Sequence, residues 1–246
     1  MTAHAAAASR SATALGCVKA VVAGLVISAA GTVPWILLTS VNARVHPEWP
    51  WAALVTVAYV TLFLAWLGGA GWPKSTREFR KQSLRLNVPR GSVWQGANGM
   101  TSAAVMGAIL MMAALWILVS LPHAPLDMTP YRTTAIRISL FVMGPLMSGV
   151  IEEAAFRGYM QSWIERYSPQ LAIVVTSIVF TLAHLTHGWQ ALLLLGPGYF
   201  IVSVLYGVLV RRTGSILPGI VVHVIGDASY GFFALLGANA TLLIAR

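Results

Sequence analysis

The segment at residues 149–161 reads GVIEEAAFRGYMQ and follows, after a single serine, the apolar run ISLFVMGPLM. Two adjacent carboxylates, Glu152 and Glu153, and the cation Arg157 therefore lie in a stretch whose neighbours are suited to lipid. An ionisable side chain at the centre of a bilayer costs about 2.5–3.5 kcal/mol on insertion scales. A chain that keeps such groups in one apolar helix needs them for folding or for chemistry.

The composition of the chain places it in a membrane. Of its 246 residues, 57% are hydrophobic and 9% are charged, and the mean hydropathy is +0.75. Soluble domains carry about 25% charged residues, so the composition excludes a soluble enzyme. The net charge of +9 comes from basic residues that lie between apolar runs, which predicts topology-setting loops and no nucleic-acid partner. The single cysteine, Cys17, excludes an intrachain disulfide.

The uncharged stretches predict an all-α fold, a polytopic bundle of about seven transmembrane helices, because each crossing needs roughly 20 apolar residues. The expected helices cover residues 20–41, 50–72, 98–121, 133–166, 169–187, 190–210 and 215–236. The sequence Gly196-Pro197-Gly198 predicts a kink or partial unwinding in the sixth helix. An eighth, partial helix in the apolar tail would move only the C-terminus.

The chain divides into three parts along its length. Residues 1–14 form an expected disordered N-terminal tail, residues 15–130 hold three transmembrane helices, and residues 131–246 hold the polar groups in lipid. The first three helices are interrupted by a strongly basic loop at 74–90, which predicts that this loop and the N-terminus are cytoplasmic. Anionic-lipid binding is a secondary interpretation of the loop. We therefore expect an integral multi-pass protein of the plasma membrane.

The ionisable groups that are costly to place in lipid come from three different helices, but they lie at a similar depth in the bilayer. With a rise of 1.5 Å per residue, Glu152 lies about 21 Å from the cytoplasmic end of its helix. His184 lies about 22 Å and His223 about 17 Å from the corresponding ends of theirs. A gathering of ionisable groups at one level of the bilayer indicates a functional site, whereas an ion or proton carrier would string them through the membrane.

Spacing within the helices predicts which groups pair. Glu153 and Arg157 are four residues apart and can form an ion pair on one face, while Glu152 points about 100° away. His223 and Asp227 are also four residues apart. Taken singly, each of these is an ordinary structural pair or a buried histidine. Glu152, without a local partner, is the candidate general base.

The motifs Glu152-Glu153-x-x-x-Arg157, Phe180-x-x-x-His184 and His223-x-x-x-Asp227 closely resemble those of the CPBP family. That family comprises the type II CAAX prenyl endopeptidases and the Abi proteins, which include bacteriocin-processing and bacteriocin-immunity proteins. The resemblance covers roughly residues 138–236 and is most specific at Glu-Glu-x-x-Phe-Arg-Gly-Tyr. By contrast, the chain has no His-Glu-x-x-His zinc-protease motif and no Gly-x-Ser-Gly motif of a serine enzyme.

The resemblance implies an all-helical intramembrane endopeptidase that cleaves a peptide bond of a membrane-associated protein or peptide. It implies that Glu152 and His184 activate water, that Glu153 and Arg157 form an orienting ion pair, and that the third motif supports the oxyanion. The alternative from another class is a non-catalytic bacteriocin-immunity or scaffold protein of the same family.

Asp227 departs from the best-known relatives, which have asparagine at this position. An amide can donate to an oxyanion, whereas an ionised carboxylate repels it, so Asp227 must be protonated, orient His223 or bind a metal. In a zinc enzyme, Glu152, His184 and His223 would be three ligands that leave an open water position. A metal-free glutamate mechanism is equally compatible with these residues, and the sequence leaves both open.

Overall fold

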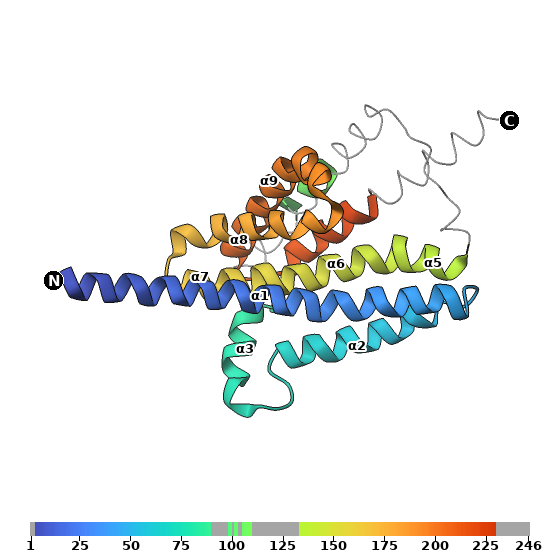
Figure 1. Ribbon diagram of the computed structural model, residues 1–246, viewed down its shortest axis with the longest axis horizontal. Helices are drawn as coiled ribbons and strands as arrows, with labels where there is room; N and C mark the ends of the chain where they lie inside the picture. Colours follow the sequence, from blue (N-terminus) through green and yellow to red (C-terminus); the bar gives the residue numbers. More distant parts are fainter. Residues whose placement is uncertain (1–2, 90–97, 100, 103–104, 110–132, 230–246) are drawn as a thin grey trace.

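The computed structural model describes residues 3–89, 98–99, 101–102, 105–109 and 133–229, and these residues form helices and connections without a strand. This confirms the all-α class (Figure 1). In chain order the elements are α1 (Ala3–Val45), α2 (Trp51–Leu67), η1 (Lys74–Thr76), α3 (Arg77–Leu84), α5 (Thr134–Ile138), η3 (Ser139–Met143), α6 (Gly144–Glu152), η4 (Glu153–Gln161), α7 (Ser162–Glu165), α8 (Pro169–Ala183), η5 (His184–His187) and α9 (Trp189–Thr213). A last helix covers Leu217–Ser229.

Residues 149–161 lie in one long, unbroken helix, which is formed by α5, η3, α6, η4 and α7. Its bounds are close to the predicted 133–166. Two of its parts, η3 and η4, are π-helical, so the backbone there is wider than an α-helix. Such π segments are rare and occur often at functional sites. The wide turn η4 begins at Glu153, directly after Glu152, and every one of its nine residues is buried.

Helix α1 runs antiparallel to this long helix and forms its main support (Figure 1). The two approach closely at small residues: a Cβ on Gly24 would lie 2.6 Å from Met160, and one on Gly31 would lie 2.5 Å from Ile151. Small residues permit such close helix packing in lipid. Helix α1 begins at Ala3, within the predicted N-terminal tail 1–14, where the alanine-rich sequence has a high helix propensity.

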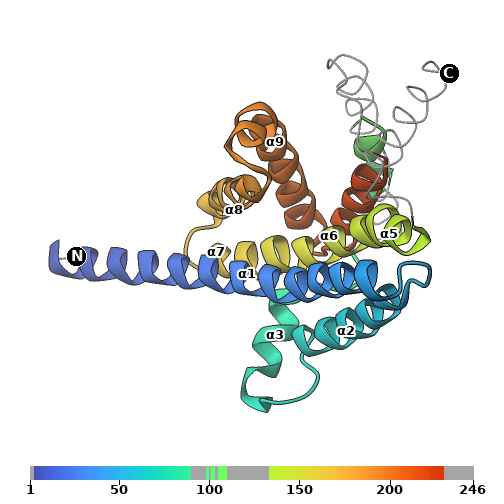
Figure 2. The same ribbon diagram turned by 45° about the vertical axis from the view of Figure 1, so that its right-hand side comes forward.

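Helices α2 and α3 lie on one side of α1. Helix α2 is shorter than the predicted span 50–72, and part of the predicted loop 74–90 folds into η1 and α3. Helix α3 stands out across the direction of the bundle (Figures 1 and 2). Tyr159 of the long helix anchors the base of α3, because its hydroxyl donates to the carbonyl oxygens of Leu67 at 2.7 Å and Arg80 at 3.3 Å.

Helices α8 and α9 lie on the other side of the long helix (Figure 2). Helix α8 with η5 matches the predicted span 169–187. Of the kink or partial unwinding expected at Gly196-Pro197-Gly198, the unwinding is wrong, since α9 continues through Pro197, and the kink stays a prediction. The loss of one backbone donor at proline leaves the rest of this 25-residue helix in place, and the flanking glycines present no side chain to its ring.

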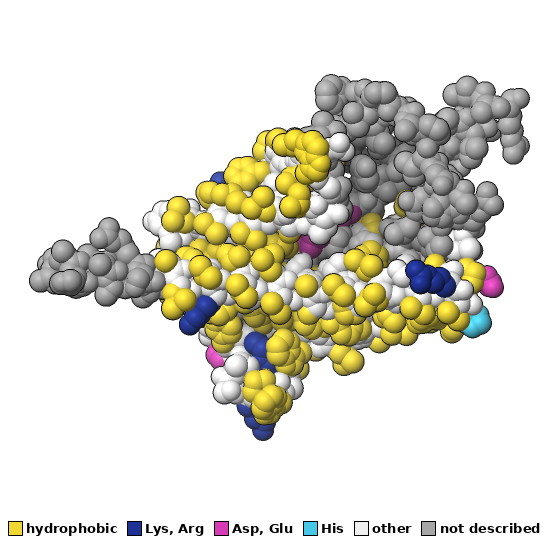
Figure 3. Space-filling view, viewed as in Figure 1, with side chains coloured by type: hydrophobic (Ala, Val, Ile, Leu, Met, Phe, Trp, Pro, Cys, Tyr) yellow, Lys and Arg dark blue, Asp and Glu magenta, His cyan; other side chains and the backbone are white. Residues whose placement is uncertain are grey.

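Only part of the predicted transmembrane arrangement is confirmed. Two described helices, Thr13–Val45 and Pro169–Thr186, are long and apolar enough to cross a membrane, and Trp51–Leu67 and Leu217–Ser229 are shorter apolar helices. Most of the predicted third span, and the end of the seventh, lie outside the described residues. Apolar side chains cover the visible faces of α1 and α2 (Figure 3), as lipid contact requires.

Candidate active site

Glu153 is the centre of the polar cluster. Its Oε1 lies 3.2 Å from Nη1 of Arg157 and 3.1 Å from Nδ1 of His223, and both glutamate and arginine are fully buried. The Arg157 pair is the one expected from the four-residue spacing. The histidine comes from a helix 70 residues further along the chain. Because a carboxylate accepts, Nδ1 of His223 donates the proton, which fixes the ring and turns Nε2 away from Glu153.

Arg157 is held by its surroundings as well as by Glu153. Its Nη2 donates to the hydroxyl of Ser203 on α9 at 2.9 Å. Its guanidinium carbon lies 4.3 Å from the ring centre of Phe180 and 5.2 Å from that of Tyr206. Aromatic faces stabilise a desolvated cation, so the buried charge is compensated from three helices. The sequence analysis missed Ser203 and Tyr206, which no motif marks.

Glu152 approaches the other nitrogen of the same imidazole. Its Oε2 lies 3.7 Å from Nε2 of His223, is buried, and makes no hydrogen bond with the described residues. The side chain as a whole is 21% exposed. The two neighbouring glutamates therefore share one histidine, Glu153 at Nδ1 and Glu152 at Nε2. The prediction that Glu152 lacks a local ion-pair partner agrees with this geometry, although the ring of His223 brings both carboxylates to one group.

Asp227 lies at the open edge of the cluster. Its Oδ2 is 3.7 Å from Nε2 of His223, which is beyond hydrogen-bond distance, and it accepts a hydrogen bond from the hydroxyl of Ser148. Glu153 therefore orients His223, which was one of the three roles predicted for Asp227. Ser148 was missed as a site residue, although it precedes Glu152 by four residues and so shares its helix face.

His184 directly follows α8 as the first residue of η5 and reaches the cluster through aromatic rings. Its Nδ1 lies 2.8 Å from the carbonyl oxygen of Phe180, and because a carbonyl oxygen only accepts, Nδ1 donates this hydrogen bond. The imidazole stacks on Tyr199 of α9 with 4.2 Å between ring centres. Phe180 bridges the two histidines, with its ring centre 4.7 Å from His184 and 6.2 Å from His223.

Zinc would need three ligands around one point. Among the described residues, no group of three or more histidine, cysteine, aspartate or glutamate side chains has a metal-binding arrangement. The predicted zinc set of Glu152, His184 and His223 therefore does not form a three-ligand site in the described part of the chain.

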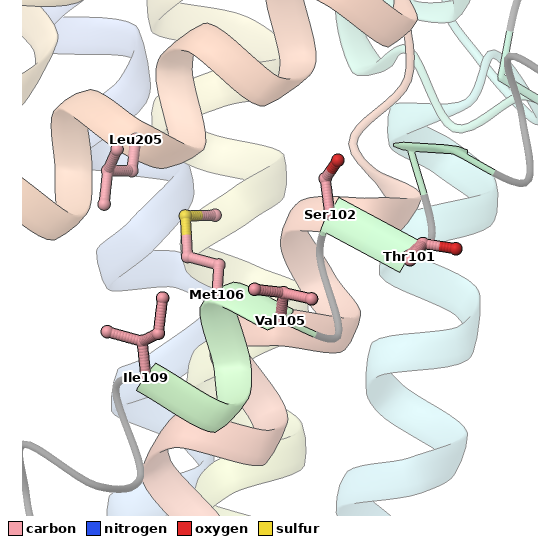
Figure 4. Close-up of a pocket in the computed structure, with 6 residues that line it drawn as sticks. All are labelled: Thr101, Ser102, Val105, Met106, Ile109 and Leu205. Atoms are coloured by element: carbon pink, nitrogen blue, oxygen red, sulfur yellow. The ribbon is translucent and has the colours of Figure 1, made fainter.

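The surroundings of the cluster are hollowed on the side of α8 and α9. Acidic side chains are visible in a recess between these helices and the long helix (Figure 3). A separate apolar cavity of about 380 Å³ is lined by Thr101, Ser102, Val105, Met106, Ile109 and Leu205 (Figure 4). None of the predicted site residues lines it. It adjoins the core of Tyr206, Leu209 and Val222, against which Met106 packs.

The comparisons with known proteins agree with the motifs. The family model of the type II CAAX prenyl endopeptidases described as Rce1-like matches residues 133–229. This range contains all six predicted site residues. No curated protein and no solved structure matches the chain.

Proposed function

We propose that the chain is an intramembrane endopeptidase, because residues 133–229 match the Rce1-like family model of type II CAAX prenyl endopeptidases. Its substrate is a peptide or protein held at the membrane, and the bond broken is a peptide bond. The N-terminus and α3 face the cytoplasm, as the basic residues of 74–90 indicate. Whether the substrate carries a prenyl group is a finer property that needs its own assay.

The observation that carries the proposal is the difference between the two neighbouring glutamates. Glu153 is fully buried, and its Oε1 lies 3.2 Å from Arg157 and 3.1 Å from His223, so its charge is paired within the fold, although its Oε2 makes no hydrogen bond among the described residues. Glu152 lies next to the same histidine but forms no ion pair with an arginine among the described residues, and its side chain is 21% exposed. A carboxylate without an arginine partner that is partly exposed can accept a proton from water.

The proposed mechanism assigns one step to each group. Glu152 takes a proton from a water molecule that attacks the peptide carbonyl, and later returns a proton to the leaving amine. His184 presents Nε2 as a second acceptor for that water. His223, in its doubly protonated form, holds Nδ1–H on Glu153 and directs Nε2–H to the oxyanion. Phe180 and Tyr206 cover the guanidinium of Arg157 and shield the Glu153–Arg157 ion pair from solvent.

The test is proteolysis of a membrane-bound reporter by purified wild-type protein and a Glu152→Gln variant. General-base catalysis contributes about 10²–10⁴-fold, so we expect a loss of that size with unchanged protein yield. Glu48→Gln is the matched control, because it makes the same change at an exposed glutamate far from the cluster. A Glu152→Gln variant that cleaves as fast as wild type would remove Glu152 from the mechanism.

The same assay addresses the non-catalytic alternative and the metal. A wild-type protein that cleaves no reporter but still protects cells from a bacteriocin would point to an immunity function of this buried ion-pair network. Activity that disappears with a chelator and returns with zinc would show that ligands outside the described arrangement complete a metal site.

A further inference from the structure

The turn between α2 and α3 forms a second polar site, remote from the glutamates. A cavity of about 310 Å³ is lined by Gly69, Ala70, Gly71, Trp72, Lys74 and Arg77. It lies at the end of α2 that points toward the N-terminal end of α1, where α3 projects sideways from the bundle (Figures 1 and 2). A helix that lies across the bundle at this level is parallel to the membrane surface.

The turn after α2, with η1 and α3, forms a projecting arm. Three of its cations are of two kinds. Arg80 is buried and donates to the carbonyl oxygens of Trp66, Ala70 and Pro73, so it caps the end of α2. Lys74 and Arg77 are exposed and make no ion pair among the described residues. Arg80 is structural, whereas Lys74 and Arg77 are cations that form no ion pair within the described part of the chain.

The cavity is suited to an anion because of the position of Glu78 and the backbone N–H groups of the turn. Glu78, the acidic residue of α3, accepts a hydrogen bond from Gln82 at 2.9 Å on the helix surface. No backbone hydrogen bond among the described residues is donated by Gly71 or Trp72. The cavity thus combines two cations with backbone donors, which is the chemistry that recognises a phosphate.

The apolar side chains beside the cavity indicate that the phosphate belongs to a lipid. Trp72 is 83% exposed, although its carbonyl oxygen is held by the indole N–H of Trp66 at 2.9 Å. Exposed tryptophans at the level of the headgroups are typical membrane anchors. Figure 3 shows yellow and dark blue side chains mixed at the end of this arm, as an interfacial helix requires.

We propose that this turn is a binding site for anionic phospholipid headgroups. The phosphate lies between Lys74 and Arg77, and the Trp72 indole enters the headgroup region beside it. This site is independent of the proposed proteolysis. It would hold α3, and through Tyr159 the long helix, in a fixed position relative to the membrane surface.

The test is native mass spectrometry of the purified full-length protein titrated with phosphatidylglycerol or phosphatidylcholine. A Lys74→Gln/Arg77→Gln variant should bind phosphatidylglycerol roughly 25-fold more weakly, since each cation near an anionic lipid contributes about a factor of five. The control Lys19→Gln/Arg212→Gln removes two exposed cations at the same end of the bundle but outside the cavity. Screening at physiological salt should limit its effect to about threefold.

Three outcomes would overturn the proposal. The first is equal binding of the two lipids by wild-type protein. The second is an equal loss of affinity in the cavity variant and in its control, which would reflect net charge alone. The third is displacement of the lipid by inorganic phosphate at concentrations equal to those of the lipid, which would identify a site for a free anion.

Discussion

Replacing Arg157 by methionine should destabilise the protein while keeping most of the side-chain volume. Arg157 and Glu153 are both fully buried, and their contact of 3.2 Å is the ion pair at the centre of the cluster. Removal of one partner of a buried pair typically costs about 3–5 kcal/mol, because the other charge stays in low dielectric without compensation. The hydrogen bond from His223 to Glu153 remains, which places the ion-pair cost near the lower end of that range.

The aromatic contacts of Arg157 add to this cost. The guanidinium lies 4.3 Å from the ring centre of Phe180, and a desolvated cation–π contact contributes about 2 kcal/mol. We therefore expect Arg157→Met to lower the free energy of unfolding by about 4–5 kcal/mol. The assay is unfolding in mixed micelles with increasing dodecyl sulfate, followed by tryptophan fluorescence. Arg44→Met, at an exposed arginine near the end of α1, is the control and should change stability little.

A double variant separates the ion pair from general packing. Glu153→Gln/Arg157→Met removes both charges together, so it should be more stable than Arg157→Met alone by about 2 kcal/mol or more. The reasoning is refuted if the double variant is as unstable as the sum of the two single changes. It is also refuted if Arg157→Met unfolds at the same detergent concentration as wild type.

Two further changes test other parts of the site. Gly219→Ala would place a Cβ 2.7 Å from Oε2 of Glu153, so we expect a loss of about 1–3 kcal/mol in detergent unfolding together with lower proteolysis. Gly198→Ala, whose Cβ meets no atom within 4 Å, should leave both unchanged; equal effects would contradict the packing argument. Asp227→Asn keeps an acceptor for the Ser148 hydroxyl, so reporter cleavage should stay within about tenfold of wild type. A complete loss that zinc partly restores would instead show that Asp227 binds a metal.

The elements that local sequence controls were predictable. The long helix was expected at 133–166 and covers 134–165, and the helix with His184 was expected at 169–187 and ends there. The Glu153–Arg157 pair also followed from spacing, because residues four apart on one helix meet without any help from the rest of the chain. Conversely, the π-helical segment η4 was not predicted, because hydrophobic periodicity distinguishes poorly between an α-helix and a π-helix.

What the sequence by itself determined is an all-helical membrane chain, the identity of the polar residues in lipid, and the pairs formed within one helix. Only the tertiary structure decided that His223 donates to Glu153, that Ser148 bonds to Asp227, and that Phe180 lies between the two histidines. Only it showed that Arg80 is a buried cap while Lys74 and Arg77 stay exposed. These contacts join residues from different helices, and their geometry depends on how whole helices pack rather than on any spacing along the chain.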